Sequence, residues 1–575
     1  MRLGFHKKVV GGRLGSWLSA HGVDAIVAFL CLVFSWWLMA STFGYANGQF
    51  IIASKLWSDF GAHIPLLRSF SMGANWPPEY PQFSGEPIRY HYLFYLLVGL
   101  LERVGLRLDI ALNLLSAFGF WLLLWMLYST AKLFFKSKAA GVLSVILFLS
   151  NGSLNYIRFF ENLSSVSIQG VWEDLKGLTS FLSFGPWDGQ NISAFWTLNI
   201  YTNQRHLGLG FAVLLALLYP LFERVVVRLS ERAAPFVERK KMGNSSEFWR
   251  NWCVPLVLAV FPLLHQAAYL SFIMLASLWL LLYWRHFSLR WLAPYVVGFV
   301  ASVGAVLSIS QGSAGHHLVL AFGYLSKAAD FDSFIRYWFD NLGLYLPLLF
   351  VVALAAPWKY RRLILISLPL FIAANTILFS PDMINNHKLL NVFFLFLVLV
   401  AAGLLADWWK QGWQKKVLVC IFLPFLLFSG VLDLVPIIRD TVVYLPDYKM
   451  NESALWIANN TPPQSRFLTT VYFHSAPSLV GRRTFLDYGY YAWSMGYDDA
   501  SRRELLHRIF AQDTTTVEVC RILEEHALEY LYVTKNTDLA TDIVTTRSAF
   551  LRASVPLLRT SQGDAIYSVS QTCSQ

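Results

Sequence analysis

The chain has 575 residues, of which 56% are hydrophobic and only 14% are charged. The apolar residues come in repeated blocks instead of alternating with polar ones, which excludes a water-soluble globular protein of this length. The net charge of +11 does not indicate nucleic-acid binding, because the basic residues cluster beside the apolar blocks, where lipid headgroups and the positive-inside bias account for them.

The apolar blocks have the length of membrane spans. About 20 apolar residues cross a bilayer core, and block follows block from Val23 to about Val435. The first block, 23–41, comes after a basic segment but has no clear small-residue cleavage site. We therefore interpret it as an uncleaved first span and not as a signal peptide.

Six basic connections predict the topology, because basic loops of multi-pass proteins face the cytoplasm. They are the N-terminus, Lys136 with Lys138, the loop 224–250 with its basic segment 239–241, the loop 285–290, the segment 359–362 and the segment 410–416. One path of about eleven spans places all six on the cytoplasmic side. Its spans lie near 23–42, 108–134, 139–156, 205–227, 251–266, 268–284, 291–311, 343–357, 363–380, 389–407 and 417–435. The path requires the short apolar stretch 91–104 to be a juxtamembrane or re-entrant helix.

The tail after about residue 436 has a different pattern. Helices are predicted at 453–459, 502–511 and 515–527, and strands at 466–472, 528–534 and 565–569. We therefore expect a polytopic α-helical membrane domain over 1–435, with an outer loop 43–107, and a small soluble α/β domain over 436–575 on the extracytoplasmic side. Cys520 and Cys573 are the cysteines of this tail, and they can pair in an oxidising compartment.

The first outer loop contains an acid and an imidazole at helical spacing. Asp59 and His63 are four residues apart, so a helix there places both on one face. A carboxylate beside an imidazole at a membrane surface fits an acid/base pair or a metal pair. The structural alternative is that Asp59 caps the helix and His63 anchors it among the headgroups.

The same loop resembles a known superfamily. Nine residues after Asp59 comes Arg68, and then follow the step Gly73-Ala-Asn-Trp76, a Pro-rich turn and an apolar juxtamembrane stretch. This arrangement resembles the C-type (GT-C) superfamily of integral-membrane glycosyltransferases, and within it the protein O-mannosyltransferases and the lipid A aminoarabinose transferases. Those branches begin the motif with Asp-Glu and an aromatic residue, whereas here Phe60 follows Asp59 directly. Such enzymes commonly carry a soluble domain after the last span.

The resemblance implies an inverting transfer of a sugar from a polyprenyl-phosphate donor to a lipid, glycan or protein acceptor outside the cytoplasm, by a multi-pass protein of the cell (inner) membrane. Asp59 matches the position of the family's catalytic aspartate, so it is the expected general base, with His63 beside it. A cation must hold the leaving phosphate, and Arg205 and Lys388 each stand where a span begins at the outer interface. We expect these two and Asp59 around one cavity. The alternative for either cation is that it only extends to the headgroups.

Further polar residues of the outer loops are candidates for substrate binding. They are Glu79, Glu86, Tyr90, His91, Asn203, His206, His265, Asn386 and His387. The two glutamates lie in a Pro/Gly-rich turn that they could merely solvate, and His265 fits a buried corner histidine as well as a ligand. No cofactor requirement can be read from the sequence, and the pattern lacks the Cys/His spacing of a zinc site, so a metal stays open without support.

Two other classes of function fit a chain with many spans. A transporter or flippase would more often show paired repeats and ionisable residues in mid-span, whereas the polar residues here gather at one face and no internal repeat is visible. A non-catalytic protein of envelope assembly is the other alternative. The sequence does not identify the sugar or the acceptor.

Overall fold

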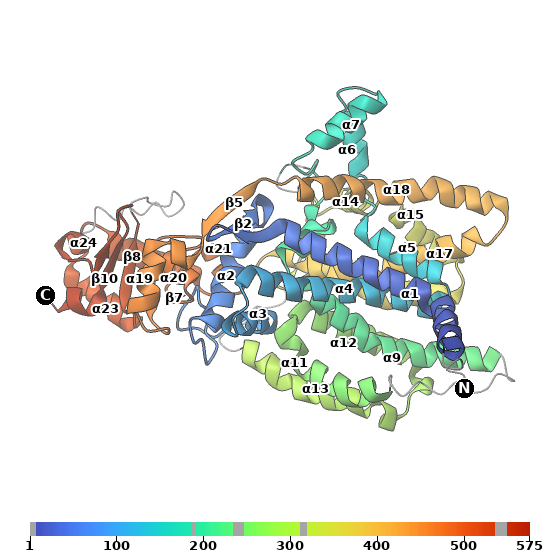
Figure 1. Ribbon diagram of the computed structural model, residues 1–575, viewed down its shortest axis with the longest axis horizontal. Helices are drawn as coiled ribbons and strands as arrows, with labels where there is room; N and C mark the ends of the chain where they lie inside the picture. The colour runs from blue at the N-terminus through green and yellow to red at the C-terminus, as the bar shows by residue number, and fades with distance from the viewer. Residues whose placement is uncertain are drawn as a thin grey trace, which may run out of the picture.

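The structure is a computed structural model that describes residues 7–183, 190–233, 247–310, 319–534 and 549–574, together with residues 185 and 188. A bundle of long helices forms one end of the molecule and a small α/β domain forms the other, with the chain termini at opposite ends (Figure 1). The basic segment 239–241 of the predicted cytoplasmic loop lies outside the described residues.

The chain is a multi-pass membrane protein. Seven helical segments among the described residues are long and apolar enough to cross a bilayer, and the count rises to eight if one bent pair of helices is a single span. The seven segments belong to α1 (Lys7–Thr42), α4 (Leu108–Phe135), α9 (Leu207–Ala233), α12 (Gln266–Tyr283), α13 (Leu289–Ser310), α17 (His387–Trp409) and α18 (Trp413–Ile438). The bent pair is α14 (Phe331–Leu342) with α15 (Tyr345–Ala355), at an angle of 100°.

The predicted count of about eleven spans exceeds this number because four predicted spans fall on shorter or more polar helices. Two are short apolar helices, α5 (Lys138–Leu149) and α11 (Val254–Leu264), the latter extended by the turn η3 (Trp249–Cys253). The third is α15, which needs α14 to reach span length. The fourth is α16 (Trp358–Thr376), which carries three basic residues in its first turn and a half.

Helix α17 is the centre of the bundle. All of its residues from His387 to Ala406 are buried, as expected of a helix that is apolar on every side and packs against protein all round. Its neighbours include α4, α5, α12 and α16. The outer end of α17 is therefore held in place by the bundle, and with it the residues at its first turn.

The outer loop forms a compact layer between the bundle and the α/β domain (Figure 1). It contains β1 (Phe43–Ala46), β2 (Gln49–Ala53), η1 (Ser54–Leu56), α2 (Trp57–Ser71) and α3 (Leu93–Arg103). Helix α3 has 11 residues, about 16 Å at 1.5 Å per residue, so it is too short to cross a bilayer, in agreement with the prediction for 91–104. Strand β2 pairs with β1 and with β5 (Val442–Pro446), both antiparallel, which fastens the outer loop to the tail.

Two smaller helical regions complete the outer side. Helices α6 (Asn155–Glu161) and α7 (Ile168–Gly177) project from the bundle. The turn η2 (Ala194–Trp196) and helix α8 (Asn199–Asn203) precede α9, while the strands β3 (Val319–Leu320) and β4 (Ile377–Leu378) and the turn η5 (Met383–Asn386) precede α17.

The tail folds as the predicted α/β domain around a five-stranded sheet of order β7-β6-β8-β10-β9. Its strands are β6 (Arg466–Thr469), β7 (Arg483–Thr484), β8 (Tyr530–Val533), β9 (Leu558–Arg559) and β10 (Ala565–Ser568). Its helices are α19 (Glu452–Asn460), α20 (Ala476–Leu479), α21 (Gly489–Ser494), α22 (Asp499–Phe510), α23 (Thr516–Glu525), α24 (Ala549–Ala553) and α25 (Val569–Cys573). Every helix and strand predicted in the tail is present, and Cys520 and Cys573 form a disulfide.

Candidate active site

A cavity of about 880 Å³ lies where the outer ends of the spans meet α2 and the α/β domain. Two kinds of wall enclose it. Its polar wall includes Asp59, His63, His91, Asn203 and Lys388. Its apolar wall comes from the spans α12 and α13 and from the segment before α17, and includes Ala267, Leu270, Val306, Ile309, Phe379 and Ile384. The cavity is therefore amphipathic, with its polar end beneath the α/β domain.

Asp59 lies in the first turn of α2 and lines the cavity. The N-cap residue of this helix is Leu56, and no side chain caps the helix, so the alternative role of Asp59 as a helix cap is not seen. Burial of the carboxylate raises its pKa to about 6, although the Lys388 charge and the Asn203 side chain act in the opposite direction. A base with a pKa slightly below neutral is ionised at pH 7 and can still accept a proton in a reaction.

Lys388 lies opposite Asp59, in the first turn of α17. Its ammonium donates to the Asn385 side chain at 3.2 Å and lies 5.7 Å from the centre of the Tyr90 ring. Charge attraction acts between Lys388 and Asp59, but no ion pair within 4.0 Å joins them in the described part of the chain. The two opposite charges therefore face a shared space that a ligand can enter.

Four histidines form a cluster next to Asp59: His63, His91, His206 and His265. The His63 ring lies 5.1 Å from Tyr95 and 6.1 Å from His206, centre to centre, and burial lowers the pKa of His63 to about 3, so this ring is neutral at pH 7. The His206 ring nitrogens bond to the hydroxyls of Tyr90 and Tyr95 at 3.2 and 2.8 Å. His63 and Asp59 share a helix face and a cavity wall as predicted, but their roles stay predictions.

Three of these rings are close enough together to suggest a metal site. Ring nitrogens of His91, His206 and His265 lie within 4.8 Å of one another. However, the His91 and His265 rings are stacked, with 4.5 Å between centres and 19° between planes, so their in-plane lone pairs run nearly parallel instead of converging on one ion. The Nδ1 of His265 also accepts the Ala268 amide at 3.1 Å, which leaves its proton on Nε2 in the neutral ring. As arranged, the cluster does not present three converging ligands.

Arg205 does not line the cavity, so its expected placement there does not hold. Its side chain is 1% exposed and donates to Thr202 O, Asn113 Oδ1 and Thr42 Oγ1 at 2.7–2.8 Å. No acid accompanies it there among the described ion pairs, and its guanidinium stacks 5.5 Å above Phe60. Arg205 thus joins α1, α4 and α8 behind α2, in place of holding a ligand.

Asn386 and His387 also face protein. The Asn386 amide donates to Ala374 O and Ile377 O at 2.9 and 2.7 Å. The His387 ring stacks on Phe195 at 4.9 Å and contacts the Asn391 side chain at 3.1 Å. Neither Asn386 nor His387 lines the cavity. Their side chains anchor the start of α17 instead.

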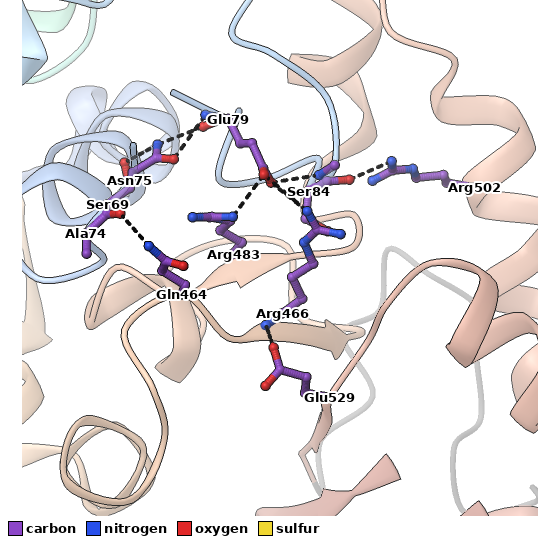
Figure 2. A network of polar contacts seen from close by, with 11 residues as sticks. Ser69, Ala74, Asn75, Glu79, Ser84, Gln464, Arg466, Arg483, Arg502 and Glu529 are labelled. Atoms are coloured by element: carbon purple, nitrogen blue, oxygen red, sulfur yellow. Dashed lines mark hydrogen bonds and ion pairs between the residues drawn. The ribbon is translucent and has the colours of Figure 1, made fainter. Parts of the chain in front are cut away.

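The two glutamates of the Pro-rich turn are structural. Figure 2 shows Glu79 between Arg466 and Arg483, which lie 3.1 and 3.0 Å from its carboxylate. Because both arginines belong to the α/β domain, Glu79 fastens the outer loop to that domain. Glu86 pairs with Arg89 at 3.0 Å. Neither glutamate lines the cavity.

Several cavity residues escaped the sequence analysis. Lys55, paired with Asp440 at 2.8 Å, and Arg89 add two cations to the lining. Helix α21 of the α/β domain forms part of the cavity wall. Its Tyr491 hydroxyl donates to Ser58 O, and its Tyr490 hydroxyl donates to the Asp382 carboxylate. The run of aromatic residues at 488–493 was the only available signal, and it did not indicate a partner more than 400 residues away.

Comparison with known proteins supports the fold. No protein-family model and no curated protein sequence matches the chain. ArnT from Cupriavidus metallidurans in the apo state superposes with a TM-score of 0.50 at 10% identity, covering 96% of this chain and 99% of that one. The same protein bound to undecaprenyl phosphate gives 0.49 at 10% identity, with 96% and 98% covered.

A third solved structure is the oligosaccharyltransferase AglB from Archaeoglobus fulgidus, in complex with an inhibitory peptide and a dolichol-phosphate. Its TM-score is 0.42 at 11% identity, with 90% of this chain and 70% of that chain covered. At these identities the likeness to ArnT in the apo state shows the fold, and the two lower scores carry no weight. The chain therefore has the fold of ArnT.

Proposed function

We propose that this protein transfers a sugar from a polyprenyl-phosphate donor to an acceptor on the extracytoplasmic side of the membrane. One observation carries the proposal: the side chains of Asp59 and Lys388 line the polar end of one amphipathic cavity, and no ion pair joins them in the described part of the chain. Two facing opposite charges attract strongly in a low dielectric. The gap between them therefore fits the anionic group of a donor beside Lys388 and the reacting hydroxyl of an acceptor beside Asp59.

The apolar wall suits the donor's isoprenoid chain. Leu270, Val306 and Ile309 belong to spans α12 and α13, and α13 exposes much of its apolar surface on the outside of the bundle, where lipid surrounds it. A lipid phosphate entering along this wall would reach Lys388 with its head group. Lysine supplies a point charge that stabilises the charge developing on a leaving phosphate.

In the proposed reaction Asp59 accepts the proton of the acceptor hydroxyl. The hydroxyl oxygen attacks the anomeric carbon of the donor sugar from the face opposite the phosphate, and the bond from that carbon to the phosphate oxygen breaks. The electron pair leaves with the polyprenyl phosphate, whose negative charge Lys388 stabilises. Attack from the opposite face inverts the anomeric configuration. Arg205 has no part in this step, since protein groups occupy its donors.

The extracytoplasmic side follows from two independent features. The turn between α17 and α18, which is one of the predicted basic segments, lies at the end of the bundle away from the α/β domain (Figure 1). The disulfide between Cys520 and Cys573 belongs in an oxidising compartment. Both features support an extracytoplasmic location of the cavity and the α/β domain.

The proposal is tested with the full-length protein in detergent and undecaprenyl-phosphate sugars labelled in the sugar, with envelope lipids and glycans as acceptors. We expect Asp59→Asn to reduce turnover about 100-fold or more, the scale of a positioned general base. Its binding of undecaprenyl phosphate and its thermal midpoint should match those of the wild type, because the amide keeps the carboxylate's size.

The matched control is Asp332→Asn, at an acid that is 88% exposed on α14 and should retain full activity. His63→Ala should cost less than Asp59→Asn if the histidine only supports α2, and about as much if the two act as a pair. Unchanged turnover in Asp59→Asn would disprove the base. Wild-type protein that moves the labelled lipid across liposome membranes without transferring sugar would support a flippase instead.

A further inference from the structure

A second cavity, of about 620 Å³, opens in the α/β domain next to the first. The two cavities share a wall, because Tyr488 and Tyr490 line both. The second cavity extends from this wall to α22, the helix that begins at Asp499. Its volume lies within the range of about 300–1,000 Å³ that small-molecule sites occupy. A group bound there is next to the reacting end of the first cavity.

The lining of this cavity is aromatic and hydrogen-bonding. Tyr472 and Trp493 join the two shared tyrosines, and these rings form one continuous cluster in which Tyr472 lies 5.2 Å from Tyr488 and Tyr490 lies 5.7 Å from Trp493. Only two leucines contribute aliphatic surface. Trp493 is 40% exposed and Tyr490 is 41% exposed. Large rings left partly open to solvent are surfaces on which a ligand can pack.

Charged and polar groups stand opposite the rings. Asp499 is buried and pairs with Arg503, whose side chain is 56% exposed, and Thr470 adds a hydroxyl. Asp487 is 3% exposed, and its Oδ2 accepts bonds from Gln82 and Ser478 at 3.1 and 2.9 Å. Its Oδ1 has no hydrogen-bond partner in the described chain. That oxygen is enclosed by protein, so the polar contacts that this side offers to a ligand come from groups such as the Arg503 guanidinium and the Thr470 hydroxyl.

We propose that the second cavity binds a carbohydrate acceptor and presents one of its hydroxyls to Asp59 past the shared wall. This inference rests on the proposed function and names the acceptor class. A sugar ring offers C–H faces that pack on aromatic rings and hydroxyls that pair with carboxylates and guanidinium groups. The lining combines these two features around one space.

The lining distinguishes a sugar from other acceptors. A lipid tail would require mainly aliphatic walls, which the first cavity has, whereas the second has only two leucines among its lining residues. An extended peptide would pair with an open strand edge, yet the strand on this side of the sheet, β7, is buried and its Arg483 and Thr484 contact Glu79 and Pro81 of the outer loop.

Saturation-transfer NMR on the full-length protein in a sugar-free detergent tests the inference. The probes are the methyl glycosides of glucose, mannose, galactose and N-acetylglucosamine, with the peptide Ala-Ser-Thr-Ala and hexane-1,2-diol as alternative classes. We expect transfer to the ring protons of at least one glycoside, and an affinity about tenfold lower in Trp493→Ala, because a stacking ring is lost. The matched control is Trp172→Ala on α7, where the tryptophan is 55% exposed and far from the cavity.

Binding of the peptide or the diol in place of every glycoside would overturn the inference, and so would glycoside binding that Trp493→Ala leaves unchanged. The assay needs neither donor nor turnover. Sugar transfer without glycoside binding would therefore refute this inference alone. Glycoside binding without transfer would refute the proposed reaction and leave the cavity as a carbohydrate site.

Discussion

At the scale of single residues, the environment of Asp59 determines what its carboxylate can do. Protein surrounds it and raises its pKa to about 6, while the positive charge of Lys388 holds that pKa down. His63 beside it is neutral and adds no charge. The tyrosines that face it, Tyr90 and Tyr491, have pKa values raised by burial and by the Asp59 charge, so they are neutral as well. Lys388 is the cation that acts on this base.

The pH dependence of transfer should therefore report Asp59. A base acts only when ionised, so kcat/KM should be constant above about pH 7 and should fall about tenfold per pH unit below about pH 6. Lys388→Gln removes the charge that stabilises the ionised carboxylate, which should move this acid limb to higher pH. The measurement is a pH profile of both proteins.

Lys176→Gln is the control for that profile, because this lysine lies on α7 beside Trp172 and should leave the limb in place. An acid limb that stays at the same pH in Lys388→Gln would show that Lys388 and Asp59 do not interact in the working protein.

At the scale of elements, the position of α2 depends on ion pairs with α3 and with the tail. Arg68, in its last turn, is 2% exposed and lies 3.1 Å from Glu102 on α3 and 2.9 Å from Asp447 at the start of the α/β domain. Together with Glu79 (Figure 2) it connects the outer loop to segments about 400 residues later. The aspartate of α2 thus owes its position to ion pairs that the tail completes.

Replacing Arg68 with methionine should destabilise the protein strongly. The substitution leaves the buried Asp447 and the half-buried Glu102 without their cation, and breaking a buried ion pair costs about 3–5 kcal/mol. Thermal unfolding in detergent, followed by circular dichroism, should show a clear drop in the midpoint. Arg336→Met removes an exposed pair on α14 and should change the stability by less than about 1 kcal/mol. Equal midpoints for the two variants would contradict the role given to Arg68.

At the scale of the whole molecule, the outer loop and the α/β domain lie at one end of the bundle (Figure 1), and residues of both line the cavity. The side of the membrane on which the cavity lies therefore follows from the topology of the entire chain. Helix α17 begins at the cavity with Lys388 and runs to the opposite end of the bundle. Helix α18 runs back from there and continues through β5 into the α/β domain. If the basic turn between α17 and α18 is cytoplasmic, the cavity is outside.

Cysteine labelling in intact cells tests this sidedness. In a background without the free cysteines Cys31, Cys253 and Cys420, a membrane-impermeant maleimide should modify Gln512→Cys after α22 directly. It should modify Gln414→Cys, at the start of α18, only after permeabilisation. Both glutamines are exposed. The reverse pattern would invert the topology and remove the extracytoplasmic assignment of the reaction.

The sequence by itself determined the features that depend on local pattern. Apolar length identified the spans, periodicity identified the helices and strands of the tail, and the spacing of Asp59 and His63 predicted a common helix face. In α5 and α15 the helix is shorter than the apolar block that predicted it, so the apolar blocks indicate about eleven spans while helix length and composition among the described residues indicate seven or eight.

Only the tertiary structure decided which polar residues face the cavity. Topology places a residue at a depth and on a side, but the rotation of its helix and its distant partners decide whether its donors are free. Arg205 finds its acceptors on α1 and α4, and Glu79 finds its arginines in the tail, so both serve the fold. Lys388 stands at the same depth as Arg205 but turns toward Asp59 and open space. Buried polar groups must be satisfied by some partner, and for these residues that partner is remote in sequence.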